Sequence, residues 1–489
     1  MNADRPNILF LMTDQMQGRV LEAGSPCQTP HFDRLAARGV RFPRAYTPNA
    51  VCSPARASLM TGLLPHSHGV LEVTHCVDDD QCNLRTVHPH WAQRLQAAGY
   101  RTGYFGKWHV ERSDDLRRFG WEVDGGTKSA RYKDAQRATG AATKDAGSFS
   151  LRGTNDHPPG YDRTLLYGVT DTPPERRGVG VATALAHEFL QDAASGDDPW
   201  CCFVSVTEPH DPFVTGEAAY AGYDVDSISL QPNVHDDLAG RPGIYRKAGR
   251  TWRGMTDRQR REAAACYYAS ITEIDAQFGS LIDLVDAAGR LDDTIVVLTS
   301  DHGELLGAHG LYCKNVSGFE EVYQIPLVIS GPGVGRGVVS EARVGLHDLA
   351  PTLLELAGLD PIGTPDSRSF RTVLADERHA GEFTRGFAEY HGGRYRLTQR
   401  IIWDGPWKLV WNGFDLDELY HLDDDPYEMR NLIDDPARQD QVAALMRYAW
   451  QVVRDTGDRA LLNSHYPILR LAPVGPRILD DETRPGKES

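Results

Sequence analysis

The stretch Asn7-Ile-Leu-Phe-Leu-Met-Thr-Asp14 decides the fold of this chain, because a short apolar run stops at a carboxylate. An apolar run of this length without alternation is typical of a strand buried on both faces, as strands of a parallel sheet are. Further runs of the same kind also stop beside polar residues. These runs are 101–105, 201–206 and 294–299, and the polar residues after them are Lys107 and His109, His210, and Asp301 and His302.

Helical patterns separate these predicted strands. The clearest spans about 257 to 288, with one apolar face, a capping box formed by Thr256 and Gln259, and Gly289 at its end. Alternation of strands and helices predicts a parallel sheet covered by helices. Ligand sites of such sheets lie at the carboxyl ends of the strands, so we expect the polar residues above to meet with Asp14 at one edge.

A second informative stretch is Cys52-Ser-Pro-Ala-Arg56. Pro54 suits the first turn of a helix, which we predict over 55–60, so that Cys52 lies just ahead of the helix N-terminus. Free N–H groups and the helix dipole favour an anion there, and Arg56 can direct a cation to the same place. The stretch therefore indicates a nucleophile beside an anion site, while an ordinary buried cysteine is the alternative.

Composition limits the classes of function. The chain has 489 residues and a formal net charge of −16, so it can hold a large and a smaller domain and offers no general surface for nucleic acid. The first apolar run is too short for a signal peptide or a membrane span, so we expect a cytoplasmic protein that does not bind membranes. The eight cysteines do not form a dense disulfide pattern.

The character of the chain changes after residue 370. Runs at 400–404 and 407–411 predict an antiparallel hairpin, and 418–422 predicts a further strand. We therefore expect two units, 1–370 and 371–489, of which the second is a smaller α+β subdomain containing an antiparallel sheet. The tail after Tyr466 is rich in proline and is expected to be extended, which would suit contact with a neighbouring subunit of a homo-oligomer.

Other segments carry weaker indications. Residues 111–180 have little periodicity and are expected to form an irregular segment, either a lining of the site or a lid, that selects the substrate together with Arg394 and Tyr395. The glycine-rich run 331–337 lacks the spacing of a nucleotide-binding loop and predicts a turn. For His309, contact with substrate and packing of a loop are equally supported. The residues to which we assign no chemistry are His66, His68, His75, Cys76 and Cys82.

The order of these motifs resembles the type I sulfatase family. Its signature is present as Cys52-x-Pro-x-Arg followed by Ala-Ser-x-Met-Thr-Gly. The other matching blocks, in the family's order from residue 6 to about 432, contain Asp14, Lys107 and His109, His210, Asp301 and His302, Lys314, Glu320 and Glu321, and Asp348. The resemblance implies an α/β, alkaline-phosphatase-like fold, with a mostly parallel sheet sandwiched by helices.

The resemblance also implies an activity, the hydrolysis of a sulfate monoester of a small molecule or a saccharide. A separate formylglycine-generating enzyme would oxidise Cys52 to formylglycine, an aldehyde whose hydrate attacks sulfur and later releases sulfate. One divalent metal ion would complete the site, with Ca²⁺ preferred over Mn²⁺ or Mg²⁺.

Individual roles follow from the same resemblance. The residues implied for the metal are Asp14, Gln15, Cys52, Asp301 and His302. The residues implied for the chemistry are Cys52 as nucleophile, Arg56 and Lys107 to fix and acidify its hydrate, His109 as base, and His210 and Lys314 as sulfate ligands and acids. Gln15 and His302 stand where many members have Asp and Asn, so the part of Gln15 as a ligand and the identity of the metal stay open.

Two rival functions remain. Phosphonate monoester or phosphodiester hydrolases share the fold and the formylglycine, and the pairs Asp14-Gln15 and Asp301-His302 resemble theirs. The block Gly-Lys107-Trp-His109 differs from those enzymes and favours a sulfatase. The other rival is a non-catalytic metal-binding protein on the same scaffold, in which Cys52 would remain a thiol.

Overall fold

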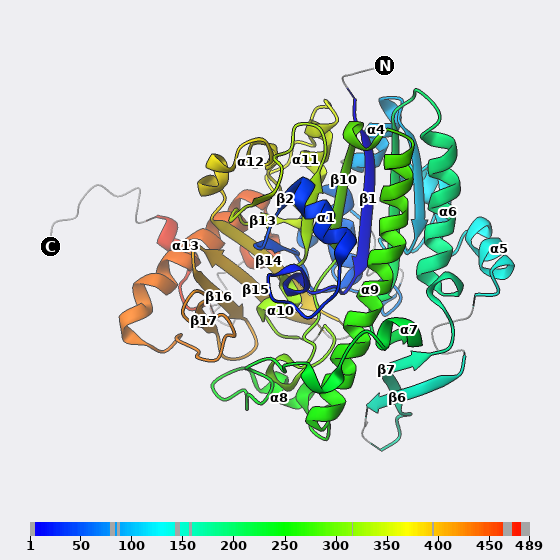
Figure 1. Ribbon diagram of the computed structural model, residues 1–489. Coiled ribbons are helices and arrows are strands. Elements are labelled where there is room, and N and C mark those ends of the chain that lie inside the picture. The colour runs from blue at the N-terminus through cyan, green and yellow to red at the C-terminus, as the bar shows by residue number, and fades with distance from the viewer. Residues whose placement is uncertain are drawn as a thin grey trace.

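The structure is a computed structural model. It describes residues 5–78, 84–85, 89–141, 147–155, 159–314, 316–393, 396–462 and 472–480. Within them the largest sheet has eight strands, in the order β12-β2-β11-β10-β1-β8-β4-β5 (Figure 1). Their bounds are β12 (Val338–Val339), β2 (Gly39–Arg41), β11 (Leu327–Ser330), β10 (Thr294–Ser300), β1 (Asn7–Asp14), β8 (Trp200–Pro209), β4 (Arg101–Gly106) and β5 (Val123–Gly126).

The predicted mostly parallel sheet is confirmed. Strand β1 pairs in parallel with β10 and β8, and β4 pairs in parallel with β8 and β5. Only at the other side does the direction change, where β11 runs antiparallel to both β10 and β2. The parallel strands therefore present their carboxyl ends at one edge of the sheet, as the sequence indicated.

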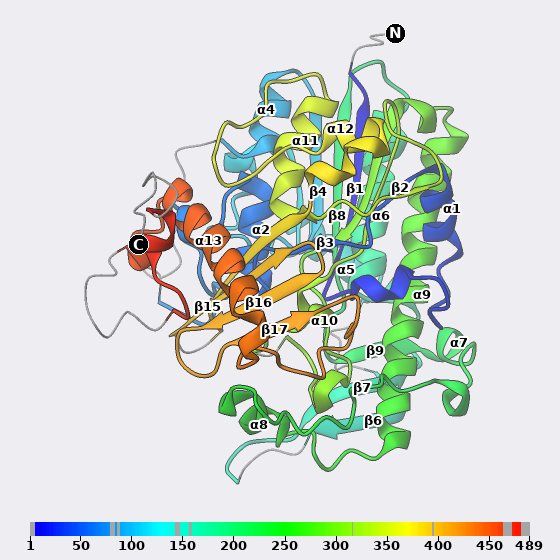
Figure 2. The ribbon, with the colours of Figure 1, turned by 90° about the vertical axis from the view of Figure 1, so that its left-hand side faces the viewer.

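Helices cover both faces of this sheet. On one face lie α1 (Pro30–Arg38), α6 (Gly178–Ala193) and α9 (Asp257–Ala287); on the other lie α2 (Cys52–Thr61), α4 (Trp91–Ala97), α11 (Leu349–Leu356) and α12 (Arg371–Ala375) (Figures 1 and 2). Side chains of β1 alternate between the two layers, with Leu9 and Leu11 in one core and Ile8, Phe10 and Met12 in the other. This alternation explains why the whole run is apolar.

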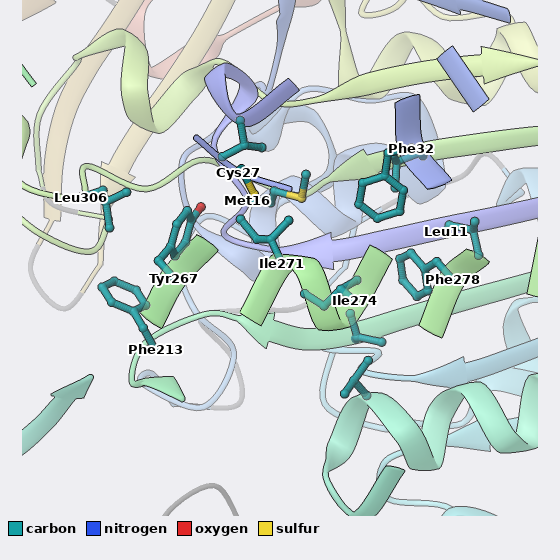
Figure 3. Close-up of a cluster of buried hydrophobic side chains, with 14 of the residues drawn as sticks. Leu11, Met16, Cys27, Phe32, Phe213, Tyr267, Ile271, Ile274, Phe278 and Leu306 are labelled. Atoms are coloured by element: carbon teal, nitrogen blue, oxygen red, sulfur yellow. The ribbon is translucent and has the colours of Figure 1, made fainter. Parts of the chain in front are cut away.

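Helix α9 shows how the sequence builds one of these cores. Its predicted capping box is present, with the Thr256 hydroxyl accepting from the Gln259 N–H, so the expected helix is confirmed. Ile271, Ile274 and Phe278 are fully buried and lie toward β1 (Figure 3). Burying side chains of this size contributes roughly 1.5–3 kcal/mol each, which fixes α9 against the sheet.

A four-stranded antiparallel sheet follows in the chain, in the order β14-β15-β16-β17. Its strands are β14 (Arg385–Gly392), β15 (Arg396–Asp404), β16 (Trp407–Asn412) and β17 (Glu418–His421), and helix α13 (Gln439–Thr456) covers one face. The predicted hairpin and third strand are confirmed, whereas β14 was not predicted. The described part of the tail, 472–480, returns to α13, where the Trp450 Nε1–H donates to the Val474 carbonyl at 2.7 Å.

The expectation of an irregular segment over 111–180 was wrong. This segment contains β5, α5 (Ala130–Ala138) and a hairpin of β6 (Phe149–Asn155) and β7 (Thr164–Thr170). Strand β7 pairs in parallel with β9 (Phe213–Gly216), which lies far along the chain. A pairing over such a distance leaves no local pattern, and five of the seven residues of β6 are exposed or half-buried, so the local signal was weak.

The remaining elements connect these layers. The short strands and helices are β3 (Ala45–Tyr46), β13 (Val344–Gly345), α3 (Pro65–His68), α7 (Glu217–Tyr220), α8 (Gly243–Gly249), α10 (Glu320–Tyr323) and α14 (Arg459–Leu462). The 3₁₀ helices are η1 (Gly18–Leu21), η3 (Leu116–Phe119), η4 (Pro174–Arg176), η5 (Val225–Ser227), η6 (Leu291–Asp293), η7 (Ala308–Gly310), η8 (Leu346–Asp348), η9 (Glu377–Glu382), η10 (Pro436–Arg438) and η12 (Pro476–Leu479). None of the helices among the described residues combines the length and the apolar character needed to cross a membrane.

Candidate active site

The carboxyl ends of the parallel strands bring the predicted residues to one place. Asp14 is the last residue of β1, while Lys107, His210 and Asp301 follow β4, β8 and β10. A pocket of about 1050 Å³ opens at this edge. The predicted site residues that line it are Cys52, Lys107, His109, His210 and Lys314.

Helix α2 places Cys52 at the bottom of this pocket. Cys52 is the first residue of the helix and 2% exposed, so the prediction that it precedes the helix was off by a few residues. Pro54 is therefore the third residue, which is tolerated because the N–H groups of the first turn have no partner within the helix. Gly62, with φ of 71°, ends the helix in the left-handed conformation.

Arg56 joins two carboxylates that come from different strands. Its Nη2 donates to Oδ2 of Asp14 at 2.9 Å and its Nε donates to Oδ2 of Asp301 at 2.8 Å. Its Nη1 donates to the Ser205 hydroxyl at 2.7 Å. Burial lowers the pKa of Arg56, but the two carboxylates outweigh burial and raise it. We call Arg56, Asp14 and Asp301 the Arg56 cluster; it holds both carboxylates in fixed orientations.

Charge around Cys52 favours an anion at this position. Lys107 Nζ lies 2.5 Å from Oδ2 of Asp14, next to the helix N-terminus. Burial raises the pKa of the Cys52 thiol, but Lys107, Lys314 and His302 hold it well below its usual value. Burial also raises the pKa of Asp14, yet its neighbouring cations hold it well below its usual range, so that Asp14 stays ionised.

Four side chains could hold a metal ion together. Asp14, Cys52, Asp301 and His302 each offer a ligand atom, and these atoms lie within 4.8 Å of one another. Nδ1 of His302 lies 2.9 Å from the Gly303 carbonyl, which leaves Nε2 directed to Cys52, 3.2 Å from Sγ. This is the arrangement of a metal-binding imidazole, whose second nitrogen is held by an acceptor. Two carboxylates with one imidazole fit Ca²⁺, Mg²⁺ or Mn²⁺.

Gln15 lies between the metal-binding group and the pocket wall. Its Nε2 donates to Oε2 of Glu304 at 2.5 Å and to Oδ1 of Asp211 at 2.9 Å. Its Oε1 accepts from Nζ of Lys314 at 2.8 Å. Gln15 also has a φ of 69°, which is uncommon for a residue other than glycine. Its side chain is therefore tied to the part of the site that carries Lys314.

Lys314 and His210 form the opposite wall. Nζ of Lys314 contacts Nε2 of His210, and Nδ1 of His210 lies 2.7 Å from the Asp211 carbonyl. Burial lowers the pKa of Lys314, but Cys52, Asp14 and Asp211 outweigh it and raise the pKa, so Lys314 stays charged. A cation and an imidazole thus face the residue at the start of α2.

His109 stacks on a second histidine that the sequence did not suggest. The two rings are 5.1 Å apart between centroids, and His75 Nδ1 lies 3.0 Å from His109 Nε2. Burial lowers the pKa of His109, so it is neutral and able to accept a proton. His75 and Cys76 line the pocket, while Cys82 lies outside the described residues. No spacing in the sequence would have revealed this pair, because the contact depends on the turns after α3 and β4.

Some pocket residues were not predicted, and some predicted residues lie away from the pocket or outside the described residues. Trp252 and Tyr390 line the pocket, and Tyr390 comes from β14 of the antiparallel sheet. Arg394 and Tyr395, the predicted substrate contacts, lie outside the described residues. His309 is not among the lining residues described; it is buried, stacks on Phe319 at 3.7 Å and contacts Asp236 at 2.6 Å. The residues of 111–180 that line the pocket are Glu111, Arg112, Asp114, Thr127 and Lys128.

Comparison with known proteins supports the reading of this site. The Sulfatase family model matches residues 6–359, and the model for the C-terminal part of N-sulphoglucosamine sulphohydrolase matches residues 307–455. The "Uncharacterized sulfatase YidJ" of Escherichia coli (strain K12) is 31% identical over 443 residues, covering 88% of this chain and 84% of the relative. A choline-sulfatase of Rhizobium meliloti (strain 1021) is 30% identical over 470 residues, covering 89% and 84%.

A solved structure shows the same fold. A phosphonate monoester hydrolase from Silicibacter pomeroyi superposes with a TM-score of 0.77 at 24% identity, covering 94% of this chain and 97% of that chain. The fold is thus an alkaline-phosphatase-like α/β fold, with a mostly parallel sheet between two layers of helices. The chain belongs to the sulfatase family, as the order of its motifs predicted, and it is a sulfuric ester hydrolase.

Proposed function

We propose that this protein hydrolyses a sulfate monoester by means of a formylglycine made from Cys52 and one divalent metal ion. The observation that carries the proposal is the convergence of Asp14, Asp301 and His302 on Cys52 at the bottom of an accessible pocket. A formylglycine-generating enzyme is then a required partner, because the side chain must be oxidised before turnover.

Asp14, Asp301, His302 and residue 52 would hold the metal, and Gln15 is a further candidate ligand. Once present, the metal and the formylglycine hydrate would supply, respectively, a Lewis acid for the sulfate oxygens and a nucleophilic hydroxyl with a second hydroxyl for release. Calcium is the first ion to test, followed by Mn²⁺ and Mg²⁺, because oxygen ligands dominate the set.

The other side chains bind the sulfate group or transfer protons. Lys314 and His210 bind the sulfate oxygens from the pocket side, where their charge compensates the charge that develops on sulfate. The same pair supplies a proton to the departing alcohol. Arg56 and Lys107 keep the carboxylates and residue 52 in position, and neutral His109 accepts a proton from the group at position 52.

The pocket supports a small-molecule or saccharide sulfate as the substrate class. Its volume exceeds what a sulfate group requires, and its wall combines Trp252 and Tyr390 with charged residues of both signs.

The described cysteines form no disulfide, which agrees with a cytoplasmic location. We also propose the division into units 1–370 and 371–489, and a homo-oligomer that forms through the C-terminal tail.

The second candidate function is hydrolysis of phosphonate monoesters or phosphodiesters. Two observations favour it, the fold shared with a phosphonate monoester hydrolase and the presence of Gln15 and His302 in the metal-binding region. Measured kcat/KM for an aryl sulfate and an aryl phosphonate monoester, on one preparation with known conversion of Cys52, separates the two. We expect the sulfate to be preferred; a large preference for the phosphonate would overturn the proposal. Metal uptake without turnover of either ester would indicate the non-catalytic scaffold.

A further inference from the structure

We propose that Glu304 is a positioning residue of this site, which fixes the side-chain amide of Gln15 and the turn that carries Lys314. The inference deepens the proposed function and rests on it, because that function assigns sulfate binding to Lys314. Glu304 follows β10 and is completely buried, and the pocket-lining residues that the structure describes do not include it. It therefore acts through its neighbours rather than on the substrate.

One oxygen of the Glu304 carboxylate determines which way the Gln15 amide faces. Oε2 of Glu304 accepts from Nε2 of Gln15 at 2.5 Å, and Oδ1 of Asp211 accepts from the same nitrogen at 2.9 Å. Because the ammonium group of Lys314, on the other side of the amide, can only donate hydrogen bonds, the NH₂ group must face the two carboxyl groups. Oε1 of Gln15 then has to face Lys314, whose ammonium group donates to it at 2.8 Å. The polarity of three partners thus specifies a single amide orientation.

The other oxygen holds the turn in front of Lys314. Oε1 of Glu304 accepts from the N–H groups of Leu306 at 2.9 Å and Cys313 at 2.6 Å. Cys313 directly precedes Lys314 and has a φ of 63°, in the left-handed region that costs a residue other than glycine of order 1 kcal/mol or more. The hydrogen bond to Glu304 compensates for this cost. The backbone that carries Lys314 therefore depends on the same carboxylate as Gln15.

The position of Glu304 is itself fixed by the fold. Its N–H donates to the Glu321 carbonyl at 3.0 Å, and its own carbonyl accepts from Nε2 of Gln17 at 2.5 Å. A Cβ added at Gly303 would lie 2.0 Å from the Glu321 oxygen, so only glycine allows this close approach. Glu304 consequently connects the end of β1 with the Lys314 turn through a rigid support.

Glu304→Gln tests this role because it changes polarity and almost no volume. The new NH₂ group would face the NH₂ group of Gln15, so the Gln15 amide turns over and directs its nitrogen at the Lys314 ammonium group. We expect kcat/KM for an aryl sulfate to fall about 10²-fold, as when one charge-stabilising donor is misplaced. The dissociation constant for inorganic sulfate, measured by calorimetry, should rise about 10-fold for the same reason.

The double variant Gln15→Glu with Glu304→Gln restores one donor facing one acceptor between positions 15 and 304, while Asp211 loses the donor that Gln15 supplied, so the recovery is partial. It should recover about 10-fold in kcat/KM over Glu304→Gln, a coupling typical of groups in contact. If Glu304→Gln folds poorly, the comparison starts from the single variant Gln15→Glu, in which the carboxyl groups at positions 15 and 304 oppose each other. Adding Glu304→Gln to this variant must then raise kcat/KM. A merely structural carboxylate would not produce rescue by reversed polarity.

Glu418→Gln is the matched control. Glu418 is fully buried and hydrogen-bonded to Tyr245 at 2.8 Å and Tyr420 at 2.6 Å, away from the pocket. It should lower the melting temperature but leave kcat/KM and sulfate affinity unchanged. The proposal is overturned if Glu304→Gln keeps wild-type kcat/KM and sulfate affinity, or if the double variant is no better than Glu304→Gln. Absence of aryl sulfate turnover in the converted wild type would instead refute the proposed function, and sulfate affinity would still test Glu304.

Discussion

The Arg56 cluster and a second buried ion cluster are built alike but face different surroundings. The second, which we call the Lys408 cluster, consists of Lys408, Glu320 and Glu428. Nζ of Lys408 lies 2.8 Å from Oε1 of Glu320 and 2.7 Å from Oε1 of Glu428. Tyr46 and Trp403 donate to the Glu320 carboxylate at 2.6 and 2.8 Å, and the cavity that Glu320 borders has only about 250 Å³. The Arg56 cluster instead lies beside the large pocket.

The two clusters also differ in charge. Burial raises the pKa of Glu428 to about 8, so near neutral pH the Lys408 cluster holds one cation and one anion. Around the Arg56 cluster, Lys107 and Lys314 add positive charge next to Cys52. Burial and ion pairing are thus common to both regions, and what distinguishes the functional one is surplus charge beside an accessible cavity.

The largest effect we expect comes from removing the side chain of Cys52, beside which Lys107 and Lys314 add positive charge. Cys52→Ala should lower kcat for an aryl sulfate more than about 10⁴-fold, because the side chain proposed as the source of the nucleophile is gone. Its melting temperature should stay close to that of the wild type, since the side chain is small. Unchanged turnover would show that the chemistry does not involve position 52.

Lys408→Met should lower the free energy of unfolding and leave kcat/KM unchanged. Removing the cation leaves Glu320 buried without its partner, which costs about 3–5 kcal/mol in the free energy of unfolding. Denaturant unfolding measures this loss, and kcat/KM per folded molecule should remain that of the wild type. A loss of kcat/KM per folded molecule would mean that the Lys408 cluster also contributes to activity.

Lys314→Met is the matched change beside the Arg56 cluster and should lower activity more than stability. We expect kcat/KM for an aryl sulfate to fall about 10²-fold, because a cation that faces the sulfate oxygens is lost. Stability should fall less than in Lys408→Met, since Lys314 borders the pocket and the carboxylates of Asp14 and Asp301 keep Arg56 as a partner. Loss of stability without loss of kcat/KM would reverse the roles we assign to the two lysines.

The last effect concerns a third buried contact, between His66 and Glu389, and changes only how stability depends on pH. Burial lowers the pKa of His66, but Glu389, 2.5 Å away, outweighs it and raises the pKa from 6.5 to about 9. The stabilisation, up to about 3 kcal/mol, is complete below pH 6.5 and is lost as the pH rises through 9. Stability curves of the wild type and His66→Gln should therefore converge at high pH. His235→Gln, at an exposed histidine, is the control and should show no such convergence.

Much of the fold could be predicted from the sequence, as could the site residues that lie at the carboxyl ends of the parallel strands. Apolar runs ending at Asp14 and before Asp301 indicated parallel strands, and parallel strands bring their ends to one edge whatever their order. The Lys408 cluster left no comparable signal, because Lys408 stands alone in an apolar run and Glu428 is one of several acidic residues near the end of β17. They meet only in the folded chain, where β16 pairs with β17 and Nζ of Lys408 lies 2.7 Å from Oε1 of Glu428.

The walls of the site could not be predicted for the same reason. Tyr390 reaches the pocket from β14, a strand that was not expected, and Trp252 comes from a loop without periodicity. His75 meets His109 only after two turns have folded. Glu304 belonged to a recognised block, yet its partners Gln15 and Cys313 lie far from it or across a tight turn. Local pattern specifies strand ends, whereas side-chain neighbours depend on long-range packing.

The most direct test of the central claim is turnover measured against the converted fraction of residue 52. Preparations with different amounts of formylglycine, produced by varying co-expression of the generating enzyme, are quantified by mass spectrometry of the peptide that contains this residue. We predict that kcat for a sulfate ester rises in proportion to the aldehyde fraction and vanishes when residue 52 is entirely a thiol. Full activity in a preparation that contains only the Cys52 thiol would contradict the account.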